Sequence, residues 1–205
     1  GNGNYAYIDR ALEAKKVLGD EMSSTLFTIA KDVKIQVEFN PAVISQYRLV
    51  GYENRALREE DFDNDAVDAG DIGAGHQVTA IYEVVPAGAK GWIAPRRYED
   101  RPATEAELRM AEAAHVKLRY KLPGGDMSRL IDTVVMSDDF RSARLPRGDF
   151  AFAASVAAFG QILRGDTLMN GFDFADARAL AGPQQDYWRQ EFVKLTELAD
   201  AMKGG

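Results

Sequence analysis

The residues whose types and spacing could bind a metal ion lie in an acidic segment at positions 59–71. The segment contains no Lys or Arg and holds Glu59, Glu60, Asp61, Asp63, Asp65, Asp68 and Asp71. Asp61, Asp63 and Asp65 repeat the first, third and fifth positions of an EF-hand loop, whose oxygen ligands suit calcium. The match ends there, because Ala66 stands where that loop needs Gly and Ile72 where it needs a bidentate Glu. We therefore expect a solvated acidic loop without a metal ion, and a calcium-stabilised structural domain is an alternative.

A second candidate is His76, which closes a Gly-Ala-Gly-His sequence just after the acidic segment. A histidine oriented by a carboxylate can act as a general base, so His76 with an acid of residues 61–71 would suit a hydrolase. The structural alternative is that His76 hydrogen-bonds to the preceding turn and fixes the start of a strand. The chain has no Cys and no Gly-x-Ser-x-Gly motif, so it lacks both a cysteine nucleophile and the serine of a nucleophile elbow. We favour the structural interpretation and expect no catalytic residue.

Other short motifs indicate structure rather than ligand binding. Gly70, Gly73 and Gly75 lack the order of a dinucleotide-binding fingerprint and precede a strand instead of a helix, so we expect no cofactor. Arg-Gly-Asp occurs at 147–149 and 164–166, both at expected helix boundaries where Gly and Asp can serve as caps. A basic row alternates along one expected strand and should form a solvated face. This row comprises His115, Lys117, Arg119 and Lys121.

The acidic segment also accounts for the net charge of the chain. Among the 205 residues, 25 are Lys or Arg and 32 are Asp or Glu, which gives a formal net charge of -7. Without the acids of residues 59–71, acidic and basic residues balance. A balanced chain is not a strongly basic nucleic-acid binder. No apolar run approaches the roughly 20 residues of a membrane span, so we expect no transmembrane segment in this fragment.

Alternation of apolar and polar residues predicts β-structure through the middle of the chain. Five segments show it or are rich in β-forming residues: 33–39, 47–52, 76–85, 115–122 and 130–136. The last two flank a Pro-Gly-Gly-Asp turn and are typical of a hairpin. Thr104 and Glu107 fit a capping box, which favours a short helix over 105–113. Strands with polar outer faces predict an antiparallel β-sandwich, over residues 31–145.

Helical periodicity replaces this alternation from about Asp149. One helix should end near Gly165, a shorter one should cover 174–180, and a third should run to the end of the chain. The third helix carries an apolar stripe of Trp188, Phe192, Leu195, Leu198 and Met202. We expect four aromatic residues to pack the helices together: Phe152, Phe159, Trp188 and Phe192. Strands followed by helices define the α+β class, here an antiparallel β-sandwich followed by a C-terminal helical segment at 146–205.

The first 30 residues predict a separate unit. Tyr5–Ile8 is a short apolar run, and Asp9 is placed to cap a helix whose apolar stripe runs from Leu12 to Ile29. A single strand and a single helix cannot bury both of their faces alone. We therefore expect residues 1–30 to be the end of a truncated domain.

Several long blocks of the sequence resemble a bacterial protein family. Residues 1–9 and 14–18 resemble the last strand and last helix of a von Willebrand factor type A domain. Residues 33–41 (VKIQVEFNP), 47–55 (YRLVGYENR) and 68–84 (DAGDIGAGHQVTAIYEV) resemble the C-terminal region of YfbK-like proteins. That region follows a type A domain and has no characterised function.

The resemblance implies a type A domain upstream of this chain, a cell-envelope or periplasmic setting, and no enzyme activity. Type A domains bind a divalent ion through an Asp-x-Ser-x-Ser motif, and that motif does not occur in this sequence. We therefore expect a non-catalytic protein-interaction or assembly module that accompanies a type A domain. The acidic loop and the histidine after it are the candidate contact surface: Asp61, Asp63, Asp65, Asp68, Asp71 and His76. The hydrolase and the calcium-stabilised domain stay open as alternatives.

Overall fold

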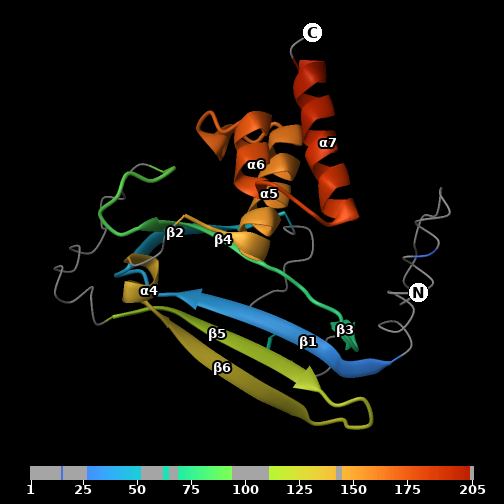
Figure 1. Cartoon of the computed structure of the whole chain (residues 1–205). Helices are drawn as coiled ribbons and strands as arrows, with labels where there is room; N and C mark the ends of the chain where they lie inside the picture. Colours follow the sequence, from blue (N-terminus) through green and yellow to red (C-terminus); the bar gives the residue numbers. More distant parts are fainter. Residues whose placement is uncertain are drawn as a thin grey trace. The chain divides into compact units, whose positions relative to one another are not determined.

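A computed structural model describes residue 15 and residues 27–51, 62–64, 69–93, 111–141 and 145–203. In these ranges the strands come first and the helices are confined to the C-terminal part (Figure 1). The elements belong to two compact units. The first unit contains β1, β3, β5 and most of β6, and the second contains β2, β4 and the helices. The strand and helix predicted before residue 27 lie outside the described residues.

The first unit is built on a four-stranded sheet. Its strand order is β3 (Gly70–Gly73), β1 (Thr28–Phe39), β5 (Glu112–Lys121) and β6 (Ser128–Met136). Lys34 pairs with Arg119 and Lys31 with Lys121, so β1 has one residue more than β5 between these two pairs. Asp32 lies in this bulge with a φ of 49°, a left-handed conformation that Asp tolerates better than most residues.

The second unit combines a two-stranded antiparallel sheet with the helices. β2 (Ile44–Val50) pairs with β4 (Ile81–Pro86). The helical elements are α4 (Ser137–Arg141), α5 (Gly148–Leu163), η4 (Thr167–Met169), α6 (Phe174–Ala181) and α7 (Tyr187–Lys203). None of the described helices is long and apolar enough to cross a membrane.

The two Arg-Gly-Asp sequences lie at helix boundaries, as predicted. Gly165, with a φ of 72°, follows α5, and its N–H donates to the Ile162 carbonyl at 3.1 Å. Asp166 then caps η4 through Leu168 N–H at 2.9 Å, so the second Arg-Gly-Asp is structural. The first Arg-Gly-Asp, at 147–149, does not cap its helix in this way. Arg147 precedes α5 without a side-chain cap, and Asp149 instead pairs with Arg189 at 2.7 Å.

Aromatic side chains hold the three long helices together, largely as predicted. The ring of Phe192 on α7 lies 5.3 Å from Phe152 and 5.5 Å from Phe159, both on α5. The fully buried Ser155 of α5 donates a 2.5 Å hydrogen bond to the Ala177 carbonyl of α6. Trp188 departs from the prediction, because its ring stacks edge-on against the neighbouring Tyr187 and stays partly exposed.

Several predicted element boundaries were wrong. β1 begins at Thr28, so Ile29 belongs to a strand and not to the predicted helix. Gly70–Gly73, expected in a loop, pairs with β1 and adds a sixth strand to the five expected. Ala113, expected at the end of a short helix, lies in β5. Residues 76–80 are exposed and irregular, because the chain passes from the first unit to the second at Val78 and has no strand to pair with there.

The α+β class is confirmed. The described residues contain two antiparallel sheets and four α-helices, with the helices after the strands. The proposed limits at 1–30, 31–145 and 146–205 stay predictions.

Phe192 and Leu195 allow a test of which face of α7 supports the fold. Phe192→Ala should lower the free energy of unfolding by about 3 kcal/mol, because it leaves a cavity between Phe152 and Phe159. Leu195→Ala should change it by less than about 1 kcal/mol, because Leu195 is 53% exposed. Urea unfolding followed by circular dichroism measures both. Equal losses would contradict this assignment of the faces.

Candidate functional site

The described part of the acidic segment lies against the first sheet. The Phe62 side chain is buried. Asp63 Oδ1 accepts a 2.8 Å hydrogen bond from Arg119 Nη1, although the Asp63 side chain is otherwise exposed. Asp71 lies in β3, and its carboxylate accepts the backbone N–H of Asp32 at 3.3 Å. The other predicted contact residues of the segment, Asp61, Asp65 and Asp68, lie outside the described residues.

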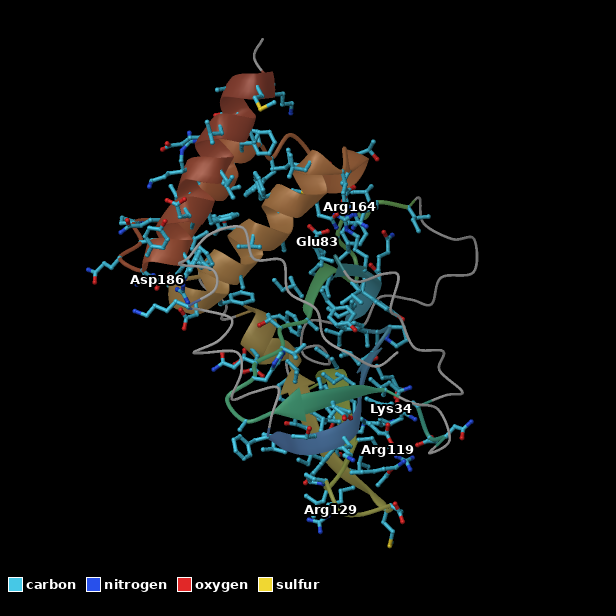
Figure 2. The ribbon with its side chains drawn as sticks, turned by 90° about the vertical axis from the view of Figure 1, so that its right-hand side faces the viewer. Lys34, Glu83, Arg119, Arg129, Arg164 and Asp186 are labelled. Carbon is cyan, nitrogen blue, oxygen red and sulfur yellow. The ribbon has the colours of Figure 1, made fainter. Side chains whose placement is uncertain are left out.

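A buried lysine explains how residues 62–64 are held. Lys34, predicted on the polar outer face of its strand, is only 4% exposed, whereas its apolar neighbour Ile35 is 44% exposed. Lys34 Nζ donates a hydrogen bond to the backbone carbonyl of Asn64. Burying an amine is tolerated only where it is hydrogen-bonded, so this contact fixes the segment on the sheet. Figure 2 labels Lys34 beside Arg119, its partner in the strand register.

The basic row on β5 is paired rather than solvated, which corrects the sequence interpretation. Each of its members lies within ion-pair distance of a carboxylate. The pairs are His115–Asp132 at 2.9 Å, Lys117–Glu38 at 3.7 Å, Arg119–Asp63 at 2.8 Å and Lys121–Asp32 at 2.6 Å. The carboxylates come from β1, β6 and the acidic segment, so this face neutralises much of its own charge. Half-exposed pairs of this kind add little free energy of folding, and they mainly position the strands and the segment.

His76 is exposed, and its backbone rather than its ring holds the preceding turn. The N–H of His76 donates to the Gly73 carbonyl at 3.0 Å, and Gly75 has a φ of 78°. The turn is tied to the start of β1 by the Ala74 N–H, which donates to the Phe27 carbonyl at 2.8 Å. The hydrogen bond at the turn agrees with the structural interpretation of His76.

The described residues also bear on the metal-site alternative. No group of three His, Asp or Glu side chains that could hold a metal ion occurs among them. Of the three aspartates with calcium-loop spacing, only Asp63 is described, and it pairs with Arg119. The calcium interpretation therefore stays a prediction.

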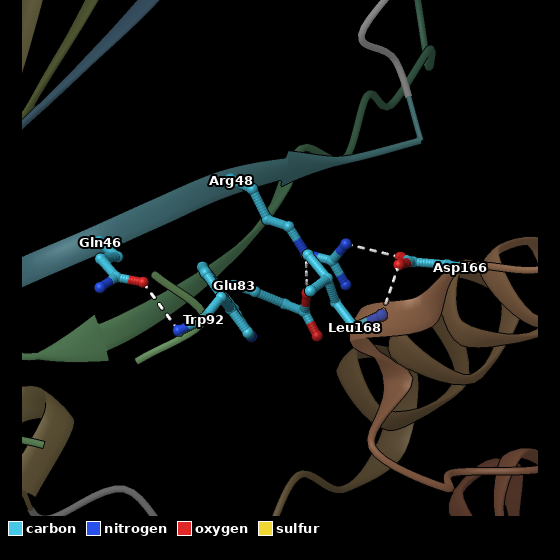
Figure 3. Close-up of polar contacts among 6 residues, drawn as sticks. All are labelled: Gln46, Arg48, Glu83, Trp92, Asp166 and Leu168. Atoms are coloured by element: carbon cyan, nitrogen blue, oxygen red, sulfur yellow. Dashed lines mark hydrogen bonds and ion pairs between the residues drawn. The ribbon is translucent and has the colours of Figure 1, made fainter. Parts of the chain in front are cut away.

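A cluster around Arg48, in the second unit, was not found from the sequence (Figure 3). Arg48 Nε on β2 donates to Glu83 Oε2 on β4, and Arg48 Nη1 donates to Asp166 Oδ2 at 2.5 Å. The guanidinium also lies 5.4 Å from the centre of the Trp92 ring, at cation–π distance. One arginine thus joins both strands of the small sheet to the cap between α5 and η4. Its Nη2 is buried and has no hydrogen-bond partner among the described residues.

The neighbouring Gln46 positions the Trp92 backbone. Gln46 Oε1 accepts the N–H groups of Trp92 at 2.8 Å and Ile93 at 3.1 Å, and Gln46 Nε2 donates to the Ile93 carbonyl at 3.0 Å. A side chain at Gly91 would collide with Gln46, because an added Cβ would lie 2.4 Å from Nε2. Gly91 therefore leaves room for the Gln46 amide, which a larger residue would displace.

The cluster shifts the pKa values of its charged groups. Burial alone would raise the pKa of Asp166, but hydrogen bonds from Leu168 N–H and Arg48, with the charges of Arg48 and Arg164, hold it below its ordinary value. Burial alone would lower the pKa of Arg48, and the hydrogen bonds to Glu83 and Asp166 raise it instead. Both groups stay charged at neutral pH. The cluster is an ion-pair network that joins β2, β4 and the cap of η4.

The helical part of the second unit also presents an apolar surface to solvent. The predicted stripe of α7 is divided, because Phe192 points into the helix core while Leu195 (53%), Leu198 (61%) and Met202 (84%) are exposed. Trp188, Leu195 and Met202 are spaced by seven residues and therefore share one face of the helix. We call Tyr187, Trp188, Leu195, Leu198 and Met202 the outer stripe of α7. This stripe gives α7 an exposed apolar face directly beside Phe192, which packs on α5.

Comparison with known proteins places the chain in a family. A family model described as "Uncharacterized protein YfbK, C-terminal" matches residues 24–202. The chain belongs to the YfbK C-terminal family. It is 43% identical over 206 residues to an "Uncharacterized protein YfbK" from Escherichia coli (strain K12), an alignment that covers 98% of this chain and 35% of the relative. No solved structure matches the chain.

These comparisons confirm the predicted resemblance to the C-terminal region of YfbK-like proteins. They indicate no catalytic family, and they name no ligand or partner. The chain spans about a third of the length of the Escherichia coli YfbK protein that it matches.

Lys34 provides a test of what holds the acidic segment. Lys34→Ala should lower the free energy of unfolding by about 2 kcal/mol, because it removes a buried hydrogen bond and the stem that covers the sheet. Lys117→Ala is the matched control on the same face, and its loss should stay below about 1 kcal/mol. Denaturant unfolding measures both variants. The assignment is wrong if the two substitutions cost the same.

The Arg48–Asp166 pair predicts a defined pH dependence. Because the pKa of Asp166 is lower in the folded chain than its ordinary 3.8, the pair stabilises the fold fully above that pH, and the contribution is lost as pH falls through the folded value. Asp166→Asn should therefore destabilise the chain by about 1–3 kcal/mol at neutral pH and by less in acid. Urea midpoints of both proteins at about pH 7 and about pH 3 test this. A difference that does not shrink in acid would refute the assigned ion pair.

Proposed function

We propose that the chain is a non-catalytic protein-interaction module whose contact surface is the outer stripe of α7. The observation that supports this most directly is the exposed apolar face of α7, with Leu195, Leu198 and Met202 all exposed. Exposed apolar surface costs about 25 cal/mol per Å² relative to its burial, and contiguous patches of it commonly mark interaction sites. The fold does not require this stripe, because Phe192 and the buried Thr196 supply the inner contacts of α7.

The spacing of the stripe favours an amphipathic helix as its occupant. Trp188, Leu195 and Met202 occupy one position of a seven-residue repeat, and Leu198 occupies the second apolar position between the last two. A helix that packs there would present its own apolar residues at intervals of three and four. The charges of α7 balance, with Arg189, Lys194 and Lys203 against Glu191, Glu197 and Asp200. The contact would therefore depend on apolar packing more than on net charge.

We further propose that this helix belongs to a longer protein that carries a von Willebrand factor type A domain in the bacterial cell envelope. Two observations support the proposal. The sequence blocks at 1–9 and 14–18 resemble the end of such a domain, and the Escherichia coli relative extends well beyond the region that this chain matches. In this arrangement α7 would dock the module to the type A domain or to what that domain binds.

Binding of the type A domain tests the proposal directly. The domain encoded with this chain, produced as a separate polypeptide, should shift the fluorescence of Trp188 to shorter wavelength as that ring leaves water. Trp92→Phe removes the only other tryptophan signal. Leu195→Glu should weaken binding roughly tenfold or more, because it places a charge in the apolar contact.

Leu163→Glu is the matched control, since it also replaces an exposed leucine of the second unit by glutamate but lies on α5, outside the stripe. It should bind as the unchanged chain does. Circular dichroism confirms that both variants stay helical. Absence of binding, or equal affinities of the two glutamate variants, would exclude the outer stripe as the contact surface.

A further inference from the structure

The edge of the first sheet provides a second contact surface, separate from the outer stripe of α7. We propose that β6 pairs with β6 of a second copy of this chain, which joins two sheets edge to edge into a dimer. β6 is the last strand in the order β3-β1-β5-β6, and Figure 1 shows it as the outermost strand of that sheet. Among the described strands it therefore pairs on one side only.

β6 has few of the features that normally protect a sheet edge. Charged side chains, especially Lys, as well as Pro, bulges or a very short length keep edge strands of natural proteins from pairing with other strands. β6 is nine residues long and contains two charged residues, Arg129 and Asp132, but no Pro or Lys. Arg129 to Val134 are all exposed, including Leu130 and Ile131 at 57% each and Val134 at 44%. A long, exposed and apolar edge of this kind is suited to strand addition.

The sequence of β6 selects its own copy as the added strand. Most dimers have two-fold symmetry, and a two-fold axis perpendicular to the sheet pairs the two strands antiparallel around one residue that faces itself. Centred on Thr133, the pairing places Ile131 opposite Val135 and Leu130 opposite Met136, each pair occurring twice. Apolar pairs and Thr–Thr pairs across strands are favourable.

Neighbouring registers are poorer. Centring on Asp132 would oppose two carboxylates, which is destabilising. Centring on Ile131 would replace the two Ile131–Val135 and two Leu130–Met136 pairs by a single Ile131–Ile131 pair. In the register around Thr133, Asp132 faces Val134 of the other copy, and its carboxylate keeps its contact with His115 at 2.9 Å. The pattern of charges and apolar residues therefore favours a single register.

The contact is short, so the dimer should be weak. Stable interfaces bury about 1,200–2,000 Å², and a single strand pair falls at or below the low end of that range. We expect a monomer–dimer equilibrium that depends on concentration. This surface belongs to the first unit, whereas the outer stripe of α7 belongs to the second, so the two proposals can fail independently.

Sedimentation equilibrium of the full 205-residue chain, with and without single substitutions, tests the proposal. The unchanged chain should dimerise reversibly, and Ile131→Lys should weaken the dimer roughly tenfold or more, because it places a charge opposite Val135 in each copy. Met127→Lys, 85% exposed in the turn before β6, is the matched control and should leave the dimer unchanged. Leu195→Glu should also leave it unchanged, which separates this dimer from any contact through α7.

Because the chain contains no cysteine, cross-linking of a single introduced cysteine reports which residues face each other in the dimer. Thr133→Cys should form a disulfide-linked dimer under mild oxidation, since the two Cβ atoms of a directly opposed pair lie about 4.5–5.5 Å apart. Arg129→Cys should not, because its two copies would lie at opposite ends of the paired stretch. A chain that is monomeric at all concentrations, a dimer insensitive to Ile131→Lys, or equal cross-linking at both positions would each overturn the proposal.

Discussion

A buried amine needs a hydrogen-bond acceptor, and this requirement at Lys34 determines how the acidic segment lies on the first sheet. The acceptor is the backbone carbonyl of Asn64, and it comes from a segment thirty residues further along the chain. With that carbonyl in place, Phe62 is buried and Asp63 reaches Arg119. The bulge at Asp32 completes the arrangement, because its carboxylate contacts both Lys121 and the N–H of Ala69.

Most of the described polar residues that the sequence suggested for chemistry instead hold the fold together. Asp63, Asp71 and the basic row of β5 bond to one another or to the backbone, and Asp166 with Arg48 binds the small sheet to the helices. The described elements also expose two apolar surfaces, the outer stripe of α7 and the edge of β6. Exposed apolar surfaces of this kind commonly mark interaction sites.

The sequence located the strands and helices better than it predicted which of their side chains are buried. Period-2 and period-3.6 patterns located β1, β5, β6 and the three long helices, because these patterns arise from local geometry. The same patterns placed Lys34 outside, and this placement was wrong, because burial depends on segments that arrive from elsewhere in the chain. The apolar stripe of α7 was located, but not its division into a packed Phe192 and an exposed Leu195. The Arg48 cluster carries one sequence signal, a lone charge in the apolar run 47–52. Its partner Asp166 is 118 residues away, a separation at which no local rule applies.

The most direct measurement of the central claim is hydroxyl-radical footprinting of α7 in two contexts. The 205-residue chain alone is compared with the longer protein that we propose carries the type A domain. The account predicts that Trp188, Leu198 and Met202 are oxidised readily in the chain alone and are strongly protected in the longer protein, while the exposed Phe150 on α5 is oxidised equally in both. Equal oxidation of the outer stripe in the two contexts would contradict the claim that α7 is the contact surface.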